Sequence, residues 1–292
     1  MAISLTVRLL VCAYLVLMMF SIGMLVGAKP KADKRGRRHE RRLLVRALVL
    51  QLVVLPAVAW GILELLGAHG NAAKALLVLA VAPGGRLLPN MVRRAHGEVG
   101  LSAEISIWLA KLTAFTAPPA LALLGEVHRV ELHELDIIAA LLGLQILPYV
   151  LGRTVRRHRP AWAGRLGHPL DLVRGVIVVV FLVVLIGSGK LALLRFLGEP
   201  AWVGAVVFTA LAMGLGYLFG GREPAARRTL MLAANSHDLA LGLTLASLAY
   251  SSLPIELPVF GIWAFTFVCN LALCEILGRP HRADAQVLAP SA

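Results

Sequence analysis

Four side chains that can bind ions or carry protons stand in a row inside an apolar stretch of the chain. The row is Asn235-Ser236-His237-Asp238, preceded by Leu-Met-Leu-Ala-Ala and followed by Leu-Ala-Leu-Gly-Leu. Carboxylate, amide and hydroxyl oxygens can ligate a cation, and a histidine or a carboxylate can relay a proton. Four consecutive residues cover the whole circumference of a helix, so a regular helix would turn at least one of them into an apolar environment. The pattern predicts that a helix is interrupted at this row.

A second interruption is predicted at Pro83-Gly84-Gly85-Arg86, a few residues before Asn90. Proline removes a backbone donor and the two glycines relax the backbone, which together break a helix. Arg86 would stand at the start of a half-helix, where a buried guanidinium needs a carboxylate or water, and Asp238 is the candidate partner. Helix N-termini at such breaks attract anions, and free carbonyls attract cations. A pair of interrupted helices is typical of the binding site of a secondary transporter.

The composition requires a lipid environment for the helices that carry these residues. Of the 292 residues, 59% are hydrophobic and 15% are charged, whereas an ordinary soluble domain is about 25% charged. The 29 Lys and Arg outnumber the 16 Asp and Glu, but they cluster in short connections and form no basic face with interleaved aromatics. We therefore expect the lipid bilayer as partner, exclude a nucleic-acid partner, and find no sign of an obligate protein partner.

Nine apolar runs are each long enough, at about 20 residues, to cross a hydrocarbon core. The predicted spans are residues 9–27, 47–67, 75–92, 99–124, 136–152, 172–190, 200–220, 229–250 and 254–277. Residues 1–280 are expected to form a single transmembrane domain, followed by a cytoplasmic tail at 281–292. The expected fold class is an all-α polytopic membrane protein with nine transmembrane helices, two of them discontinuous.

The distribution of Lys and Arg predicts the orientation of these spans. Most of them fall on one side, in the connections at residues 29–46, 93–94, 153–174, 222–228 and 279–282. By the positive-inside rule this side is cytoplasmic, which puts the N-terminus outside and the C-terminus in the cytoplasm, in the plasma membrane. The first span also has features of a cleavable signal peptide, but cleavage would move the most basic connection outside, against the pattern of the others.

Several motifs resemble those of the bile acid:sodium symporter family and occur in the same order. Val81-Ala82-Pro83-Gly84-Gly85 and Gly97-Glu98-Val99-Gly100-Leu101-Ser102 are similar to the family's Cys-Pro-Gly-Gly and Gly-Asp/Asn-Val-Ala-Leu-Ser runs, with the same spacing. Shorter matches are found at residues 21–25, 50–57, 214–217 and 228–230. The resemblance covers about residues 10–277. It implies the nine-span form of a fold with two inverted repeats, a panel domain and a core domain in which the discontinuous helices cross.

The positions that bind sodium in that family are largely replaced in this chain. The family's Ser-Asn pair after Pro-Gly-Gly aligns with Leu88 and Pro89, with Asn90 one residue late. Its glutamate in the second broken helix aligns with Ala233, or with another apolar residue if Asn235-Ser236 is aligned with the family's Asn-Ser instead. The resemblance leaves three side chains as weak sodium ligands, together with backbone carbonyls: Gln51, Ser102 and Ser106. A hard cation needs about six oxygen ligands, so the sequence argues against sodium coupling of the family's usual kind.

Two replacements for sodium stay open at the level of the sequence. One hypothesis makes Arg86 a fixed cation, which would give ion-independent transport or exchange. The other makes His237 and Asp238 a proton-coupling pair, because histidine titrates near neutral pH. Glu104 lies between two of the sodium-ligand candidates and is expected to line the same cavity. The structural alternative is that these buried groups only lock the core helices together.

The predicted function is secondary active transport of a small organic anion through a cavity around residues 83–90 and 235–238. A membrane protein that binds such an anion without transporting it is the alternative. An enzyme is not expected, because adjacent Ser236, His237 and Asp238 on one helix cannot align as a catalytic triad. The chain also carries no zinc-protease motif, phosphate-binding loop or nucleophile elbow. No cofactor is expected beyond a coupling ion, either Na⁺ or H⁺.

Overall fold

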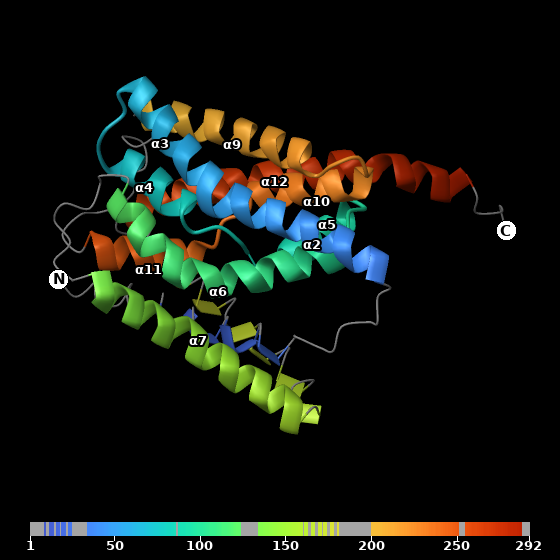
Figure 1. The fold of residues 1–292 in the computed structure, drawn as a ribbon, viewed down its shortest axis with the longest axis horizontal. Coiled ribbons are helices and arrows are strands. Elements are labelled where there is room, and N and C mark those ends of the chain that lie inside the picture. Colours follow the sequence, from blue (N-terminus) through green and yellow to red (C-terminus); the bar gives the residue numbers. More distant parts are fainter. Residues whose placement is uncertain are drawn as a thin grey trace.

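The computed structural model is helical throughout the part of the chain that it describes (Figure 1). The described residues are 9, 12–14, 16, 17, 19–21, 23, 24, 34–85, 87–123, 134–159, 161, 162, 165, 166, 169, 170, 172, 173, 176, 177, 180, 200–250 and 255–287. Their regular structure consists of α-helices and one π-helical turn, and their β contacts are limited to an isolated bridge. The predicted all-α class is confirmed.

A long rod is formed by three consecutive elements, α2 (Lys34–Val49), the π-helical turn η1 (Leu50–Val54) and α3 (Leu55–Leu66). The predicted span 47–67 covers only the second part of this rod. Hydropathy does not mark its start, because Arg and Lys are good helix formers in water. Basic residues such as Arg41 and Arg42, assigned to a connection from the sequence, therefore lie in α2. The rod ends at Gly67, which has a φ of 56° and serves as a left-handed C-cap.

Two other segments are each divided into a pair of short helices. The first pair is α4 (Asn71–Ala80) and α5 (Leu88–Arg94), and the second is α10 (Pro224–Ala234) and α11 (Leu239–Ala249). The linkers, residues 81–87 and 235–238, contain both predicted breaks. In the first linker Gly84 has a φ of 112°, a backbone conformation that residues with a Cβ rarely adopt. That each pair crosses the membrane as one discontinuous span stays a prediction.

The remaining helices are α6 (Val99–Leu123), α7 (Glu134–His158), α9 (Pro200–Phe219) and α12 (Glu256–Val287). The predicted spans 99–124 and 200–220 agree with α6 and α9 to within a residue. Helix α12 continues past the predicted end of the span at residue 277, to Val287. The predicted spans 9–27 and 172–190 lie largely outside the described residues, whose helical pieces there are short.

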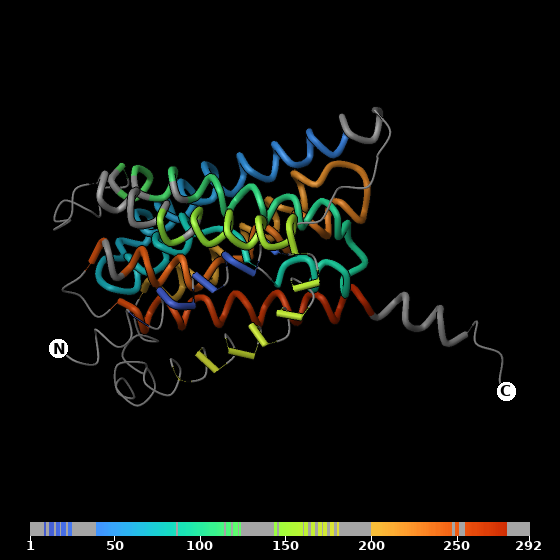
Figure 2. The backbone as a smooth tube through the Cα atoms, turned by 90° about the horizontal axis from the view of Figure 1, so that it is seen from below, coloured from blue at the N-terminus to red at the C-terminus, as the bar shows by residue number. Residues whose placement is uncertain are grey.

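The helices pack side by side (Figure 2), and two large apolar clusters fill the space between them. One cluster joins α3, α4, α9, α11 and α12, and the other joins α2, α5, α6 and α10. Helix α12 contacts both members of the first interrupted pair and also α11. Helices α9 and α10 form a tight hairpin, in which a Cβ on Gly216 would lie 2.5 Å from the Leu230 carbonyl oxygen. These contacts bring the two linkers into the middle of the bundle.

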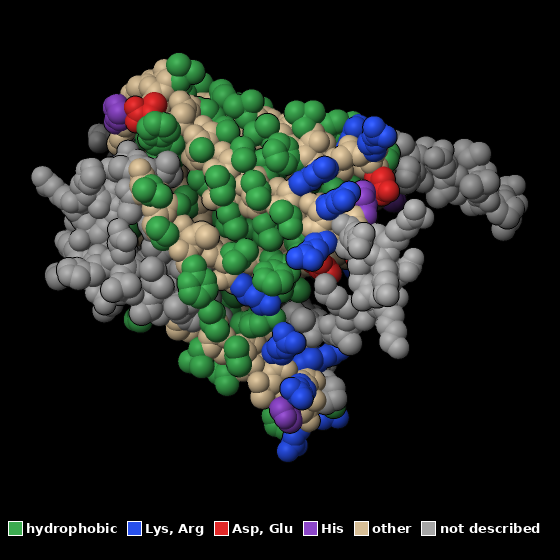
Figure 3. Space-filling view, viewed as in Figure 1, with side chains coloured by type: hydrophobic (Ala, Val, Ile, Leu, Met, Phe, Trp, Pro, Cys, Tyr) green, Lys and Arg blue, Asp and Glu red, His purple; other side chains and the backbone are tan. Residues whose placement is uncertain are grey.

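Three helical stretches in the described chain are long and apolar enough to cross a bilayer by length and composition. They are His39–Leu66, Pro200–Phe219 and Glu256–Gly278. Apolar side chains cover much of the surface in Figure 3, and Lys and Arg gather toward one end of the helices. This surface is typical of a membrane protein. The number of nine spans and the inverted repeats stay predictions.

Candidate functional site

The two helix interruptions are hydrogen-bonded to each other through their backbones. The N–H of Gly84 donates to the Ser236 carbonyl at 2.9 Å, and the N–H of Asp238 donates to the Ala82 carbonyl at 2.9 Å. Between these bonds, Pro83 and His237 form an antiparallel bridge. Backbone groups at the ends of helices lack partners within their own helix. Here each linker satisfies groups of the other, so the chain can leave the helical conformation deep inside an apolar bundle.

Helix α12 holds the second linker from the opposite side. The Asn270 Nδ2 donates to the Asn235 carbonyl and to the Ser236 hydroxyl, both at 3.2 Å. In return, the Asn235 Nδ2 donates to the Asn270 Oδ1 at 3.0 Å and to the Thr266 carbonyl at 3.1 Å. Farther along the linker, the Trp263 Nε1 donates to the carbonyl of residue 237 at 3.1 Å. Three successive linker residues are thus bound to one face of α12.

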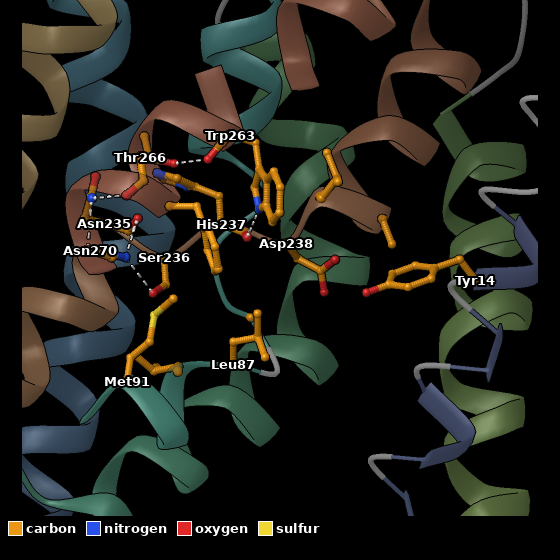
Figure 4. Close-up of a pocket in the computed structure, with 15 residues that line it drawn as sticks. Tyr14, Leu87, Met91, Asn235, Ser236, His237, Asp238, Trp263, Thr266 and Asn270 are labelled. Carbon is orange, nitrogen blue, oxygen red and sulfur yellow. Dashed lines mark hydrogen bonds between the residues drawn. The ribbon is translucent and has the colours of Figure 1, made fainter. Parts of the chain in front are cut away.

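A pocket of about 190 Å³ lies beside this linker. Its polar lining comes from the linker, from α12 and from Tyr14, and its apolar lining comes from α5 with the preceding Leu87, from α11 and from α12 (Figure 4). The polar residues are Tyr14, Asn235, Ser236, His237, Asp238, Thr266 and Asn270. In Figure 4 the hydroxyl of Tyr14 points toward the carboxylate of Asp238. Ligand pockets commonly measure about 300–1,000 Å³, so this one suits a small ligand in the present conformation.

Asp238 and His237 point in different directions although they are neighbours in the chain. The Asp238 Oδ1 accepts the N–H of Leu241 at 3.1 Å and so caps the N-terminus of α11. The ring of His237 instead packs against Phe208 of α9, with 5.8 Å between ring centroids. The backbone of Leu79 lies near this ring. Within the described chain, however, neither ring nitrogen of His237 has a hydrogen-bond partner. The two side chains therefore make no direct hydrogen bond.

The hydroxyls of the two serines predicted as sodium ligands donate hydrogen bonds to backbone carbonyls within the bundle. The Ser102 hydroxyl donates to the Val99 carbonyl at 2.7 Å. The Ser106 hydroxyl donates to the Ser102 carbonyl at 3.0 Å and reaches the Gly85 carbonyl at 3.5 Å, which places α6 against the first linker. Both oxygens keep lone pairs for a cation. Ala233 is apolar and adds no ligand, and two hydroxyls fall short of the about six oxygens that a hard cation needs, so these residues fit a complete sodium site poorly.

Gln51 and Glu104 lie away from the pocket lining. Gln51 is 1% exposed in the π-helical turn η1, and its Oε1 has no hydrogen-bond partner in the described part of the chain. π-helical turns recur at functional sites, which keeps Gln51 a candidate ligand. Glu104 is half-buried in α6. Neither residue contributes to the polar cluster around the second linker.

Two other predicted residues remain, Asn90 and Arg86. Asn90 is exposed on α5 and does not line the pocket. Arg86 lies outside the described residues. Its pairing with Asp238 therefore stays a prediction. Gly84 and Pro83 have structural roles in the crossing of the linkers, and Gly85 lines the pocket.

The sequence analysis missed the contributions of α12 and of Tyr14 to the pocket. Trp263, Thr266 and Asn270 follow a spacing of three and four residues, which places them on one helix face. An amide in the middle of an apolar span is uncommon and is a signal of a functional or packing role, and Asn270 carries it. Tyr14 has no such signal, because an aromatic residue in an apolar run is ordinary.

Apolar helices of membrane length and a polar pocket between interrupted helices define a membrane protein with an internal polar pocket. Comparison with known proteins gives the family. Residues 12–195, more than half of the chain, match the family described as "Sodium Bile acid symporter family". The chain is also 20% identical over 260 residues to the "Uncharacterized sodium-dependent transporter YocS" of Bacillus subtilis (strain 168), covering 86% of this chain and 78% of the relative. The chain belongs to the sodium bile acid symporter family, as its motifs predicted.

Proposed function

We propose that this protein is a secondary active transporter of a small organic anion, which binds in the pocket beside the second linker. The observation that carries the proposal is the direct hydrogen bonding of two helix interruptions next to a polar pocket in an apolar bundle. Membership of a symporter family supports transport as the class of function. The linker residues 235–238 supply polar groups to the pocket, and α12 adds the hydroxyl of Thr266 and the amide of Asn270.

In this proposal each interrupted pair is one discontinuous span, and the chain crosses the plasma membrane nine times. The two pairs, α4–α5 and α10–α11, would occupy corresponding places in two inverted repeats, with their linkers at the midplane. The clustering of Lys and Arg toward one end of the helices supports a cytoplasmic position for that end (Figure 3). The N-terminus is then outside and the C-terminus inside.

The proposed carrier does not depend on the sodium ligands usual in its family. Ala233, Leu88 and Pro89 replace oxygen ligands at three positions, and the remaining hydroxyls of Ser102 and Ser106 are too few to replace them. The name of the relative from Bacillus subtilis describes that protein as sodium-dependent. Sodium is therefore the coupling ion to be tested first, and the test has to be independent of the substrate.

Proton coupling through Asp238 is the second candidate, favoured by a buried carboxylate that lines the pocket. His237 does not support a two-residue relay in this conformation, because its ring packs on Phe208. Arg86 as a fixed cation would remove the need for any coupling ion. Replacing Arg86 by Ala should then abolish anion binding, and unchanged binding would reject that role.

The first experiment is uptake into proteoliposomes of three labelled anions of different size: taurocholate, benzoate and pyruvate. Uptake is measured with an inward gradient of NaCl, with KCl at the same ionic strength, and with an inward proton gradient. Saturable uptake of at least one anion above that of protein-free liposomes supports transport, and the gradient that drives it identifies the ion. Binding of a probe without uptake under any gradient would support the ligand-binding alternative instead.

Thermal unfolding of the detergent-purified protein tests sodium binding without a substrate. A ligand that binds only the folded state stabilises it by RT ln(1 + [L]/Kd), or about 2.7 kcal/mol at a hundredfold excess over Kd. Equal stability in NaCl and KCl at constant pH would support the proposal that the sodium set is lost. A rise of stability specific to NaCl would show that the retained oxygens still form an ion site.

A further inference from the structure

Asn270 is a buried residue outside the helix interruptions and is absent from the predicted site. It lies on α12 within the apolar stretch Glu256–Gly278 and is 1% exposed. A carboxamide offers two N–H donors and one carbonyl acceptor with two lone pairs. All these groups face the linker 235–238: the Nδ2 donates to the Asn235 carbonyl and the Ser236 hydroxyl, and the Oδ1 accepts from the Asn235 Nδ2. The amide orientation is therefore set by its partners.

The hydrogen bonds of Asn270 hold the same linker, residues 235–238, that pairs with the first linker. Ser236 accepts the N–H of Gly84 through its carbonyl while its hydroxyl accepts from Asn270. One residue farther, the carbonyl of residue 237 is bound to the Trp263 indole, and Asp238 follows with its carboxylate in the pocket. The linker is thus fixed between α12 on one side and residues 82–84 on the other. Movement at Asn270 would be transmitted to the pocket over a few bonds of extended chain.

We propose that Asn270 is a positioning residue of the substrate site. Its carboxamide fixes the linker 235–238 in the conformation in which the polar groups of the linker line the pocket, and it thereby sets the affinity for the transported anion. This inference rests on the proposed function for its second part, the affinity. Its first part, the local order of the linker, is independent of any substrate. No apolar residue of similar shape can replace the three hydrogen bonds, because the linker groups would stay buried without partners.

The test compares Asn270→Leu, which keeps the shape, with Asn270→Asp, which keeps the size and the acceptor but can present at most one O–H donor. Thr113→Val is the control, since Thr113 is fully buried and its hydroxyl donates only to the Leu109 carbonyl of its own helix, at 2.6 Å. Each variant is purified as the full chain, and amide exchange is followed by mass spectrometry. The peptides followed cover residues 82–88 and 235–241, with the α9 and α3 peptides as reference.

We expect amides in both linker peptides to exchange at least about tenfold faster in Asn270→Leu, with a smaller effect in Asn270→Asp. The reference peptides, and all peptides of Thr113→Val, should exchange as in the wild type. Unchanged linker exchange overturns the proposal. Faster exchange across the whole protein also overturns it, because Asn270 would then serve general stability. If Asn270→Leu does not fold, Asn270→Asp decides by the same criteria.

Uptake of whichever of the three anions the wild type transports tests the second part. Loss of positioning predicts a KM raised at least about tenfold with a smaller change in kcat per folded protein, whereas lower stability alone reduces the folded fraction and leaves KM unchanged. An unchanged KM in Asn270→Leu overturns the role in affinity. If the wild type transports none of the anions under any gradient, the proposed function fails, and the exchange experiment still decides the positioning of the linker.

Discussion

The hydroxyl of Thr229 accepts a 2.7 Å hydrogen bond from the backbone N–H of Glu98 and so joins α10 to the residue that precedes α6. The same hydroxyl donates to the Ala225 carbonyl at 2.9 Å. A Cβ on Gly97 would lie 2.7 Å from the Thr229 hydroxyl oxygen, so this approach requires a glycine there. The motifs at 97–102 and 228–230, far apart in the sequence, meet in a single contact.

Replacement of Thr229 by Val is expected to destabilise the protein by about 1–3 kcal/mol. Thr229 is fully buried, and the change leaves the N–H of Glu98 without its partner. Thermal unfolding in detergent measures the effect. Thr229→Ser keeps the hydroxyl and should recover most of the loss. A Val variant as stable as the wild type would show that water replaces the hydroxyl at this position.

Replacement of Gly216 by Ala is expected to loosen the α9–α10 hairpin. The new Cβ would lie 2.5 Å from the Leu230 carbonyl oxygen and 2.7 Å from the Cα of Met231, both backbone atoms that cannot move aside cheaply. Overpacking of this kind costs about 1–3 kcal/mol. Gly214→Ala on the same helix is the matched control, because nothing lies within 4 Å of its Cβ. Unfolding temperatures that fall equally in the two variants would contradict the packing argument.

The carboxyl group of Glu98 has a pKa above its ordinary value of 4.5. Partial desolvation is the largest cause, followed by the like charge of Glu223. His39 opposes the shift, and Glu40 adds to it. Between its ordinary and its raised pKa, Glu98 binds more protons in the folded than in the unfolded state. Its ionisation therefore costs the fold stability as the pH rises through this window, and the cost is absent below the ordinary pKa.

Glu98→Gln is accordingly expected to be more stable than the wild type at neutral pH, with a difference that vanishes in acid. Unfolding temperatures measured between about pH 4 and pH 8 check this dependence. Glu64→Gln, at an exposed position near the end of α3, controls for the removal of one negative charge. An advantage of the Glu98 variant that grows as the pH falls would be opposite to the expected sign.

Asp238→Ala is expected to lower stability by about 0.5–2 kcal/mol relative to Asp238→Asn. Both variants remove the charge from the pocket, but Asn can still accept the N–H of Leu241 as an N-cap of α11, and Ala cannot. Comparing the two variants by thermal unfolding separates the cap from the charge. Equal stability of the Ala and Asn variants would mean that the cap contributes nothing to the fold.

The sequence predicted those parts of the fold that depend on local backbone chemistry. Pro83 and the glycines after it mark the first linker, and the polar row that begins at Asn235 marks the second. Proline, glycine and buried polar groups interrupt a helix at their own position, so the sequence is enough to locate the break. The start of the first rod was less predictable. Basic residues extend α2 beyond the apolar stretch, and hydropathy carries no information on a helix in water.

The composition of the pocket was predictable only in part, because it depends on tertiary contacts. Asn270 and Tyr14 reach the pocket from helices distant in the sequence. The divergence of His237 and Asp238 could not be derived either, since it follows from the bridge that makes the linker extended at that point. In an extended chain neighbouring side chains point to opposite sides, whereas the sequence analysis placed them together as a pair.

The crossing of the two linkers is made by peptide groups, which every sequence possesses. The bonds from Gly84 to Ser236 and from Asp238 to Ala82 use main-chain atoms at both ends. Substitution of a neighbouring side chain, such as the alanine at position 233, leaves these bonds in place. The framework of the crossing and the side chains around it are therefore free to diverge separately in evolution. A lineage with this architecture can renew the chemistry of its pocket while the crossing of the two linkers is inherited unchanged.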